Sequence, residues 1–193
     1  MRSKSEMKDF VINLLKANVP KEYTYHSYEH TLYVLEKSIE IGRYEECGEK
    51  ELELLGVAAL WHDAGYTVTY NDHEEESCRL ARKYLPEYGY SFGEIDIVCG
   101  MINATKIPQS PKNKLEEILA DADLEYLGSE TFLTKSDSLF YELRSRDSSL
   151  SKVKWNQVQI SFLQKHHYFT KFCNENREKV KQSHLQDLIN SVV

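Results

Sequence analysis

The sequence predicts an all-α fold, arranged as a single-domain bundle of helices, and three observations lead to this prediction. Apolar residues recur at helical spacing along most of the 193-residue chain. With 8 glycines and 4 prolines, these two residues occur at about half their average frequency, which disfavours turn-rich β-sheet folds. Hydrophobic residues make up 41% of the chain, enough for a sizeable core, so intrinsic disorder is excluded.

The first three helices follow from apolar stripes and their end signals. The first stripe ends near Pro20 and consists of Phe10, Val11, Leu14 and Leu15. The second helix is expected at about 27–44. The third is expected at about 49–63, with Gly65 as its end signal, because glycine readily adopts the backbone conformation that stops a helix.

Two capping signatures predict where the next two helices begin. Asp72 is followed three residues later by Glu75, which predicts a capping box and a helix that reaches about Leu85. Ser91 and Glu94 repeat the same signature before another apolar run. Both helices therefore have a predicted start as well as a predicted apolar face.

The remainder of the chain is also predicted to be helical. A helix over 115–127 should stop at Gly128, and two more helices are expected from about residue 149. No internal repeat, Gly/Ser linker or low-complexity segment divides the chain. We therefore expect one domain over the whole chain, with its motifs in a core at about 22–130 and C-terminal helices at about 131–193 packed on that core.

Charge and composition narrow the classes of partner. The net charge of −7 repels a phosphate backbone, so we expect no binding to extended nucleic acid. No stretch is long and apolar enough to span a bilayer, and the N-terminal segment is an amphipathic helix rather than a secretory signal, so a cytoplasmic protein is expected. The four cysteines form no CxxC pair and indicate neither a zinc knuckle nor a disulfide framework. A homodimer remains open.

Polar residues interrupt these apolar helices at three places. His62 and Asp63 are adjacent in LWHDAGY, where burying both groups is costly unless something satisfies them. His26 and His30 stand four residues apart in YHSYEHT, on one face if that segment is helical. Taken alone, the His62-Asp63 pair is better explained as a polar contact within the core or near a helix turn.

The third place is ADADL, where Asp121 and Asp123 lie in an otherwise apolar helical pattern. Buried carboxylates need a cation or several hydrogen-bond donors. One hypothesis satisfies all three places together, namely a divalent metal ion surrounded by His30, His62, Asp63 and Asp123. Imidazole and carboxylate ligands without a thiolate suit Mn, Fe, Co, Ni, Zn or Mg, and the residue types do not choose among them.

The order His, His-Asp, Asp, with the sequences YHSYEHT, WHDAGY and ADADLEYLG, resembles the HD superfamily of metal-dependent phosphohydrolases over about 22–130. The resemblance implies an all-helical bundle of the HD-domain type. By motif position, it makes His30 the first ligand, His62 and Asp63 the doublet, and Asp123 the final aspartate. Asp123 is preferred to Asp121 because the family's aspartate follows a small residue and precedes an apolar one.

The sequence YHSYEHT also resembles the opening motif of cyclic-nucleotide phosphodiesterases, in which the earlier histidine protonates the leaving oxygen. His26 occupies that place, although a surface or capping histidine explains it equally well. Asp63 is a second candidate catalytic residue, because it could orient the attacking water. His73 could be a ligand of a second metal, a phosphate contact or simply a residue at a helix start.

Arg79 and Lys106 are further candidates for contacts to a substrate phosphate, and a solvated helix face is the alternative explanation for both. The resemblance implies a hydrolase that cleaves a phosphomonoester or phosphodiester of a nucleotide or another small phosphorylated metabolite. The alternative is a non-catalytic metal- or nucleotide-binding module that acts in signalling or partner binding. A di-iron oxygenase on the same scaffold is disfavoured, because no histidine stands near Asn103.

Overall fold

The computed structural model describes residues 3–192, and these residues form helices and no strand. The α-helices are α1 (Lys4–Asn18), α2 (Tyr28–Tyr44), α3 (Glu49–Trp61), α4 (His73–Tyr84), α5 (Phe92–Ala104), α6 (Lys114–Leu124), α7 (Phe132–Arg146), α8 (Lys152–Lys165), α9 (Lys171–Asn176) and α10 (Glu178–Val192). Three short 3₁₀ helices join them, η1 (Ala64–Thr67), η2 (Leu85–Tyr88) and η3 (Glu125–Gly128). The predicted all-α fold class is confirmed.

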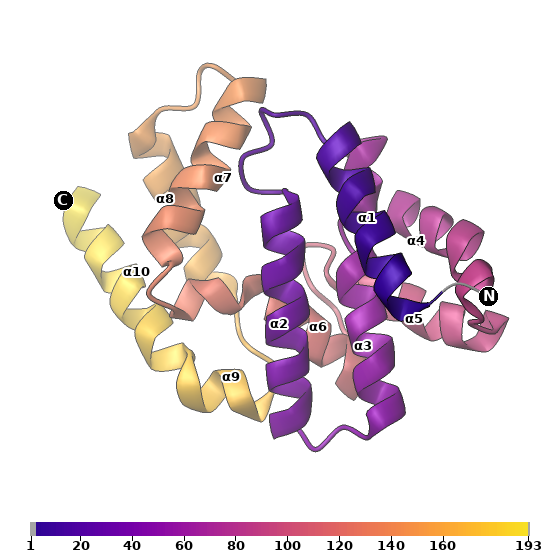
Figure 1. Ribbon diagram of the computed structural model, residues 1–193. Helices are drawn as coiled ribbons and strands as arrows, with labels where there is room; N and C mark the ends of the chain where they lie inside the picture. The colour runs from indigo at the N-terminus through magenta and orange to yellow at the C-terminus, as the bar shows by residue number, and fades with distance from the viewer. Residues whose placement is uncertain (1–2, 193) are drawn as a thin grey trace.

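Helices α2, α3 and α6 form the centre of the bundle, with α1, α4 and α5 on one side and α7 to α10 on the other (Figure 1). The larger apolar core lies among α1 to α6 and includes Trp61, whose side chain is fully buried and stacks on Tyr84. A second, smaller core lies among η3, α7, α8 and α10 around Phe132 and Leu163. The metal-ligand candidates lie where these two parts meet.

The two predicted capping boxes have different outcomes. At α5 the box is present, because the Glu94 amide donates to Ser91 Oγ at 3.4 Å and the Ser91 amide donates to Glu94 Oε2 at 2.7 Å. At α4 the prediction is wrong, because Asp72 has a positive φ of 52° and makes no side-chain cap. A capping residue normally has extended backbone. The Asp72 carboxylate instead accepts a hydrogen bond from Lys106 Nζ at 2.8 Å.

The C-terminal region contains one helix more than predicted. Two helices were expected after about residue 149, and the structure has three, with a break at 166–170 between α8 and α9. In this break, the amides of Phe169 and Thr170 donate to the buried carboxylate of Asp121 at distances of 2.8–3.1 Å, so they are satisfied outside a helix. Thr170 then caps α9 by accepting a hydrogen bond from the Cys173 amide.

Buried contacts attach the C-terminal helices to the rest of the bundle. Besides Asp121, the buried carboxylate of Glu125 is held by the guanidinium of Arg177 and the hydroxyl of Tyr33. Gly128 allows close approach here, because a Cβ at this position would lie 2.3 Å from the Arg177 carbonyl oxygen. Within residues 3–192, no helix has the length and apolar character needed to cross a bilayer.

Candidate metal centre

Three helices bring the metal-ligand candidates together. His30 lies in the first turn of α2, His62 follows α3, and Asp123 lies near the end of α6. One potential ligand atom from each of these residues lies within 4.8 Å of the other two. Both histidine side chains are buried, and the Asp123 side chain is 17% exposed at the wall of a cavity.

The tautomer of His62 is set by the main chain. His62 Nδ1 lies 2.8 Å from the carbonyl oxygen of Ala59 and donates its hydrogen there. In the neutral ring, Nε2 therefore carries a lone pair, and this atom is buried without a hydrogen bond among the described residues. It lies 3.2 Å from Asp63 Oδ2 and 3.6 Å from Asp123 Oδ1. Lone pairs that face one another repel unless a proton or a metal cation lies between them.

His30 and Asp63 complete this arrangement. His30 Nε2 lies 2.9 Å from Asp123 Oδ1 and 3.6 Å from Asp63 Oδ2. Asp63 Oδ2 is also buried without a hydrogen bond in the described part of the chain. Nitrogen and oxygen donors that converge in this way, with no sulfur, fit a divalent transition metal or Mg²⁺. The expectation of a bound divalent metal thus agrees with the donor set, and the donors do not select one ion.

The charges of the cluster act on the pKa values of its members. Burial opposes charge on His62, but the carboxylates of Asp63 and Asp123 outweigh burial and hold the pKa of His62 well above its usual value. Burial dominates at His30 and lowers its pKa. Burial would raise the pKa of Asp123, but the two neighbouring imidazoles hold that pKa well below its usual range. The two carboxylates thus provide the negative charge that a cation would neutralise.

Asp121 and Asp123 have separate surroundings. Asp121 is fully buried on the opposite side of α6, where it accepts hydrogen bonds from the Thr170 hydroxyl and from the amides at 169 and 170. Burial raises the pKa of Asp121 to about 6, although the hydrogen bonds from Thr170 oppose this rise. Asp123 faces His30 instead. The geometry therefore favours Asp123 as the ligand and gives Asp121 a structural role.

Gly65 explains how the His62-Asp63 turn fits against α4. The Gly65 amide donates to Ser77 Oγ at 2.7 Å, and that hydroxyl donates to the carbonyl oxygen of His62 at 2.6 Å. A Cβ on Gly65 would lie 2.0 Å from the carbonyl oxygen of His73. Only glycine permits this close approach of η1 to the first turn of α4.

His26 lies beside the cluster and is held on both sides. The carboxylate of Glu142, from α7, contacts His26 Nδ1 and also accepts the amide hydrogens of Tyr25 and His26 at 2.9 and 3.0 Å. The Tyr66 hydroxyl lies 3.1 Å from His26 Nε2. The ring centre of His26 is 6.2 Å from that of His30. The structure therefore places His26 next to the candidate ligands, as a general acid would require.

Glu142 is a residue that our sequence analysis missed. It is fully buried, 116 residues away from His26 in the sequence, and outside the recognised motifs. Burial would raise the pKa of Glu142, but the hydrogen bond and the charge of His26 outweigh burial and lower it. The only signal in the sequence was a carboxylate three residues after Leu139, on the face that α7 turns to the core.

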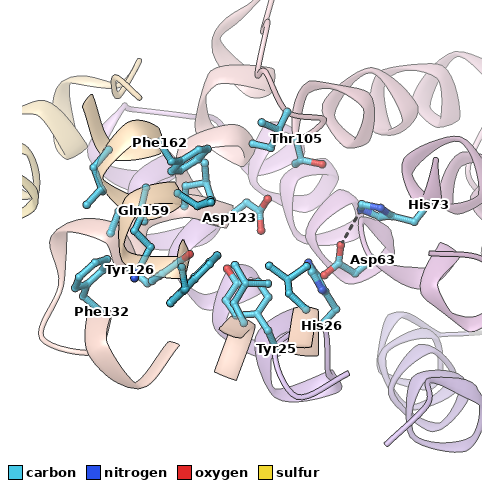
Figure 2. A pocket seen from close by; sticks show the side chains of 18 of the residues that line it. Tyr25, His26, Asp63, His73, Thr105, Asp123, Tyr126, Phe132, Gln159 and Phe162 are labelled. Atoms are coloured by element: carbon cyan, nitrogen blue, oxygen red, sulfur yellow. Dashed lines mark ion pairs between the residues drawn. The ribbon is translucent and has the colours of Figure 1, made fainter. Parts of the chain in front are cut away.

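The other candidates differ in position. His73 Nε2 lies 3.5 Å from Asp63 Oδ1 (Figure 2). The His73 ring also stacks on Tyr66, at 3.9 Å between ring centres. Arg79 is 60% exposed and pairs with Glu76 on its own helix. Lys106 is 46% exposed, pairs with Asp72, and is not among the residues that line the cavity. The structure thus brings His73 to the cluster, and it does not bring Arg79 or Lys106 there.

A cavity of about 350 Å³ opens beside the cluster, with Asp123 between its two ends (Figure 2). One end carries polar side chains from the motif region, namely His26, Asp63, Tyr66, His73, Glu74, Thr105 and Asp123. The other end is formed mainly by apolar side chains from η3, α7 and α8. The volume is at the small end of the range for ligand pockets.

Comparisons with known proteins agree with this geometry. The family model described as "HD domain" matches residues 27–125. The fold is similar to that of a predicted HD superfamily hydrolase from an uncultured Thermotogales bacterium, with a TM-score of 0.60 and 20% sequence identity. That similarity covers 95% of this chain and 91% of the other. No curated protein matches the chain. The matched family model spans half of the sequence and contains the whole candidate cluster, so the chain belongs to the HD domain family.

Proposed function

We propose that this protein is a metal-dependent phosphohydrolase that cleaves a phosphomonoester or phosphodiester bond of a small molecule. The observation that carries the proposal is the convergence of His30, His62 and Asp123 within 4.8 Å, beside His26 and at the wall of a cavity. A cluster of this kind next to a cavity has room for a reacting group as well as for an ion.

A divalent metal held by His30, His62, Asp63 and Asp123 supplies Lewis-acid stabilisation of phosphoryl oxygens and lowers the pKa of water. The protein's own part is to hold these ligands in place and to shield the reaction from bulk water. Asp63 and Asp123 both line the cavity, so a carboxylate oxygen at this wall is available to orient water. Membership of the HD domain family supports the same chemistry.

In this proposal, His26 is the general acid. Hydrolysis breaks the bond between phosphorus and the leaving oxygen, and the leaving oxygen takes the proton of His26 Nε2 as water attacks phosphorus. The Glu142 carboxylate holds the opposite ring nitrogen and fixes the orientation of the ring. The Tyr66 ring packs against the rings of both His26 and His73, at centre distances of 4.2 and 3.9 Å. Glu142 and Tyr66 are therefore positioning residues.

The test uses metal-stripped protein with added Mn²⁺, Mg²⁺, Co²⁺ or Ni²⁺ and a panel of phosphate esters that includes nucleoside monophosphates. We expect phosphate release with at least one metal. Asp123→Asn should abolish this release, whereas Asp96→Asn, at a 70% exposed position on α5, should not change it. Metal binding without turnover of any ester would contradict the proposal and favour the non-catalytic binding module.

A further inference from the structure

The cavity beside the cluster has two ends with different chemistry. The polar end carries the side chains of the HD motif region, and Asp123 lies at the boundary (Figure 2). The apolar end is lined by Leu124, Leu127, Phe132, Leu139, Leu143, Trp155, Val158, Phe162 and Leu163. A ligand that reaches the cluster with a phosphate group would therefore place its organic part against hydrocarbon.

The polar side chains that α7 and α8 place at the apolar end are hydrogen-bonded to one another. Trp155 Nε1 donates to Ser136 Oγ at 3.2 Å, and that hydroxyl donates in turn to Gln159 Oε1. Gln159 Nε2 donates to Asn156 Oδ1 at 3.4 Å. A nucleobase or sugar placed here would exchange its hydrogen bonds to water for apolar surface, which is costly. An apolar group would gain from the same transfer.

The charges of the residues that line the cavity also limit how many phosphate groups a ligand can carry. Among the described residues that line it, there is no lysine or arginine, whereas Asp63, Glu74 and Asp123 contribute carboxylates. Lys106 pairs with Asp72 outside the cavity. The positive charge of a metal ion can balance one phosphate group, and the walls add no lysine or arginine for a second or third phosphate. Diphosphates and triphosphates are therefore disfavoured.

Resting on the proposed function, we propose that the substrate is the phosphate monoester of a compact apolar alcohol, aliphatic or aromatic, whose organic group occupies the apolar end of this cavity. The HD motif region then binds the phosphate, and η3, α7 and α8 select the alcohol. Most residues that make this selection lie after residue 125, outside the segment that the HD family model matches.

The test measures binding of n-alkylphosphonates, from ethyl to hexyl, to the manganese-loaded protein. Their carbon–phosphorus bond is not an ester and is not hydrolysed, so calorimetry and Trp155 fluorescence report binding without turnover. We expect the dissociation constant to fall by about fourfold for each added methylene until the chain fills the cavity. Hexylphosphonate should also bind more tightly than AMP.

Two variants and one control test whether the dependence of affinity on chain length arises from the apolar end of the cavity. Leu143→Gln introduces a polar amide at the apolar end and should weaken hexylphosphonate binding by about tenfold, with little effect on ethylphosphonate. Val158→Gln tests the same surface at a position that is 52% exposed and therefore tolerant of a polar side chain. Leu133→Gln, on α7 but 67% exposed and outside the cavity, should leave binding unchanged.

The outcomes separate this inference from the proposed function. Affinity that does not depend on chain length, or tighter binding of AMP than of hexylphosphonate, would overturn the apolar-alcohol inference even if phosphate esters are hydrolysed. Graded binding of the phosphonates, lost in both cavity variants, without hydrolysis of the matching alkyl phosphates, would support the apolar binding site and overturn the hydrolase proposal.

Discussion

The carboxylate of Glu142 holds the ring of His26 at Nδ1 and, through Oε2, accepts the main-chain amides of residues 25 and 26. One buried side chain of α7 thus fixes both the backbone and the imidazole at the start of the motif region. Because residue 142 lies outside the segment matched by the family model, the C-terminal helices take a direct part in positioning the candidate acid.

Glu142→Gln should lower kcat by about 10²-fold on esters with poor leaving groups, because the carboxylate that positions the ring of the proposed acid is lost. The loss should be much smaller with nitrophenyl phosphate, whose leaving group needs little protonation. KM should change little. Steady-state kinetics on both substrates will check this, with Glu130→Gln, at an exposed position before α7, as the control. Equal losses on both substrates would indicate a purely structural role.

His26→Ala and His30→Ala should separate the acid from the metal. His26→Ala should keep its metal and lose roughly 10²–10⁴ in rate on poor leaving groups. His30→Ala should abolish turnover of both kinds of substrate, because a ligand is removed. Elemental analysis will measure the bound metal, and steady-state kinetics will measure turnover of both kinds of substrate. If His26→Ala still hydrolyses esters with poor leaving groups at the wild-type rate, another group must donate the proton to the leaving oxygen. His73, near Asp63, is the next candidate.

The two aspartates of α6 give a matched pair for metal content. Asp123→Asn should bind less than one tenth of the wild-type metal. Asp121→Asn should retain the metal and lose about 1–3 kcal/mol of stability, because its carboxylate accepts hydrogen bonds from three donors. Metal analysis and urea denaturation of both variants will distinguish them. The reverse pattern would assign Asp121 as the ligand.

Gly65→Ala should destabilise the fold by about 1–3 kcal/mol, because the added methyl meets the main chain of His73 and neither segment can easily move. Gly93→Ala is the matched control, since a Cβ there has no atom within 4 Å. That substitution should raise stability by about 0.5–1 kcal/mol, because residue 93 lies within α5. Thermal denaturation of both variants will measure the difference, and equal melting temperatures would contradict the close approach.

The lowered pKa of His166 leads to a prediction of how the free energy of unfolding depends on pH. Burial first, and then the charge of Lys181, lower its pKa to about 3, while Glu178 opposes this shift. The unfolded chain, with a histidine pKa of about 6.5, takes up a proton that the folded state does not bind. Stability should therefore fall as pH drops below about 6.5, by about 1–2 kcal/mol at pH 5.

Urea denaturation between pH 7 and pH 4 will measure this dependence. Replacing the histidine by a side chain that does not titrate, as in His166→Gln, should reduce the slope. Lys181 Nζ lies 3.2 Å from His166 Nδ1, and the exposed His167 also faces this region. An unchanged slope in His166→Gln would mean that other groups cause the loss of stability in acid.

Local patterns predicted the helices well, because apolar spacing and end signals act within a few residues. The Ser91–Glu94 box is such a case. Asp72 has the same local pattern but adopts a positive φ, and its carboxylate accepts a hydrogen bond from Lys106, 34 residues away. The break between α8 and α9 also depends on a distant residue, Asp121, 48 residues before Phe169. Contacts of this range leave no periodic trace in the sequence.

The residues of the candidate site also fall into those that the sequence predicted and those that it did not. The sequence singled out His30, His62 and Asp123 because polar side chains are unusual in apolar helices, and the structure brings these three together. The sequence analysis did not single out Glu142, because a single glutamate in an amphipathic helix is ordinary until its partner is known. The apolar end of the cavity was equally hidden, since core leucines and cavity-lining leucines look alike in a sequence.

The buried carboxylates of Asp121 and Glu125 have a consequence for anyone who would recombine this chain with a relative. Both lie on the segment that carries Asp123. Asp121 accepts hydrogen bonds from residues 169 and 170, and Glu125 is held by Arg177 as well as by Tyr33. A chimera that imports foreign C-terminal helices must also import partners for these two acids. Otherwise a chimera designed to change substrate selectivity would leave buried carboxylates without hydrogen-bond donors, close to the candidate metal ligands. The segment that contains α6 and the C-terminal helices should therefore be transferred together.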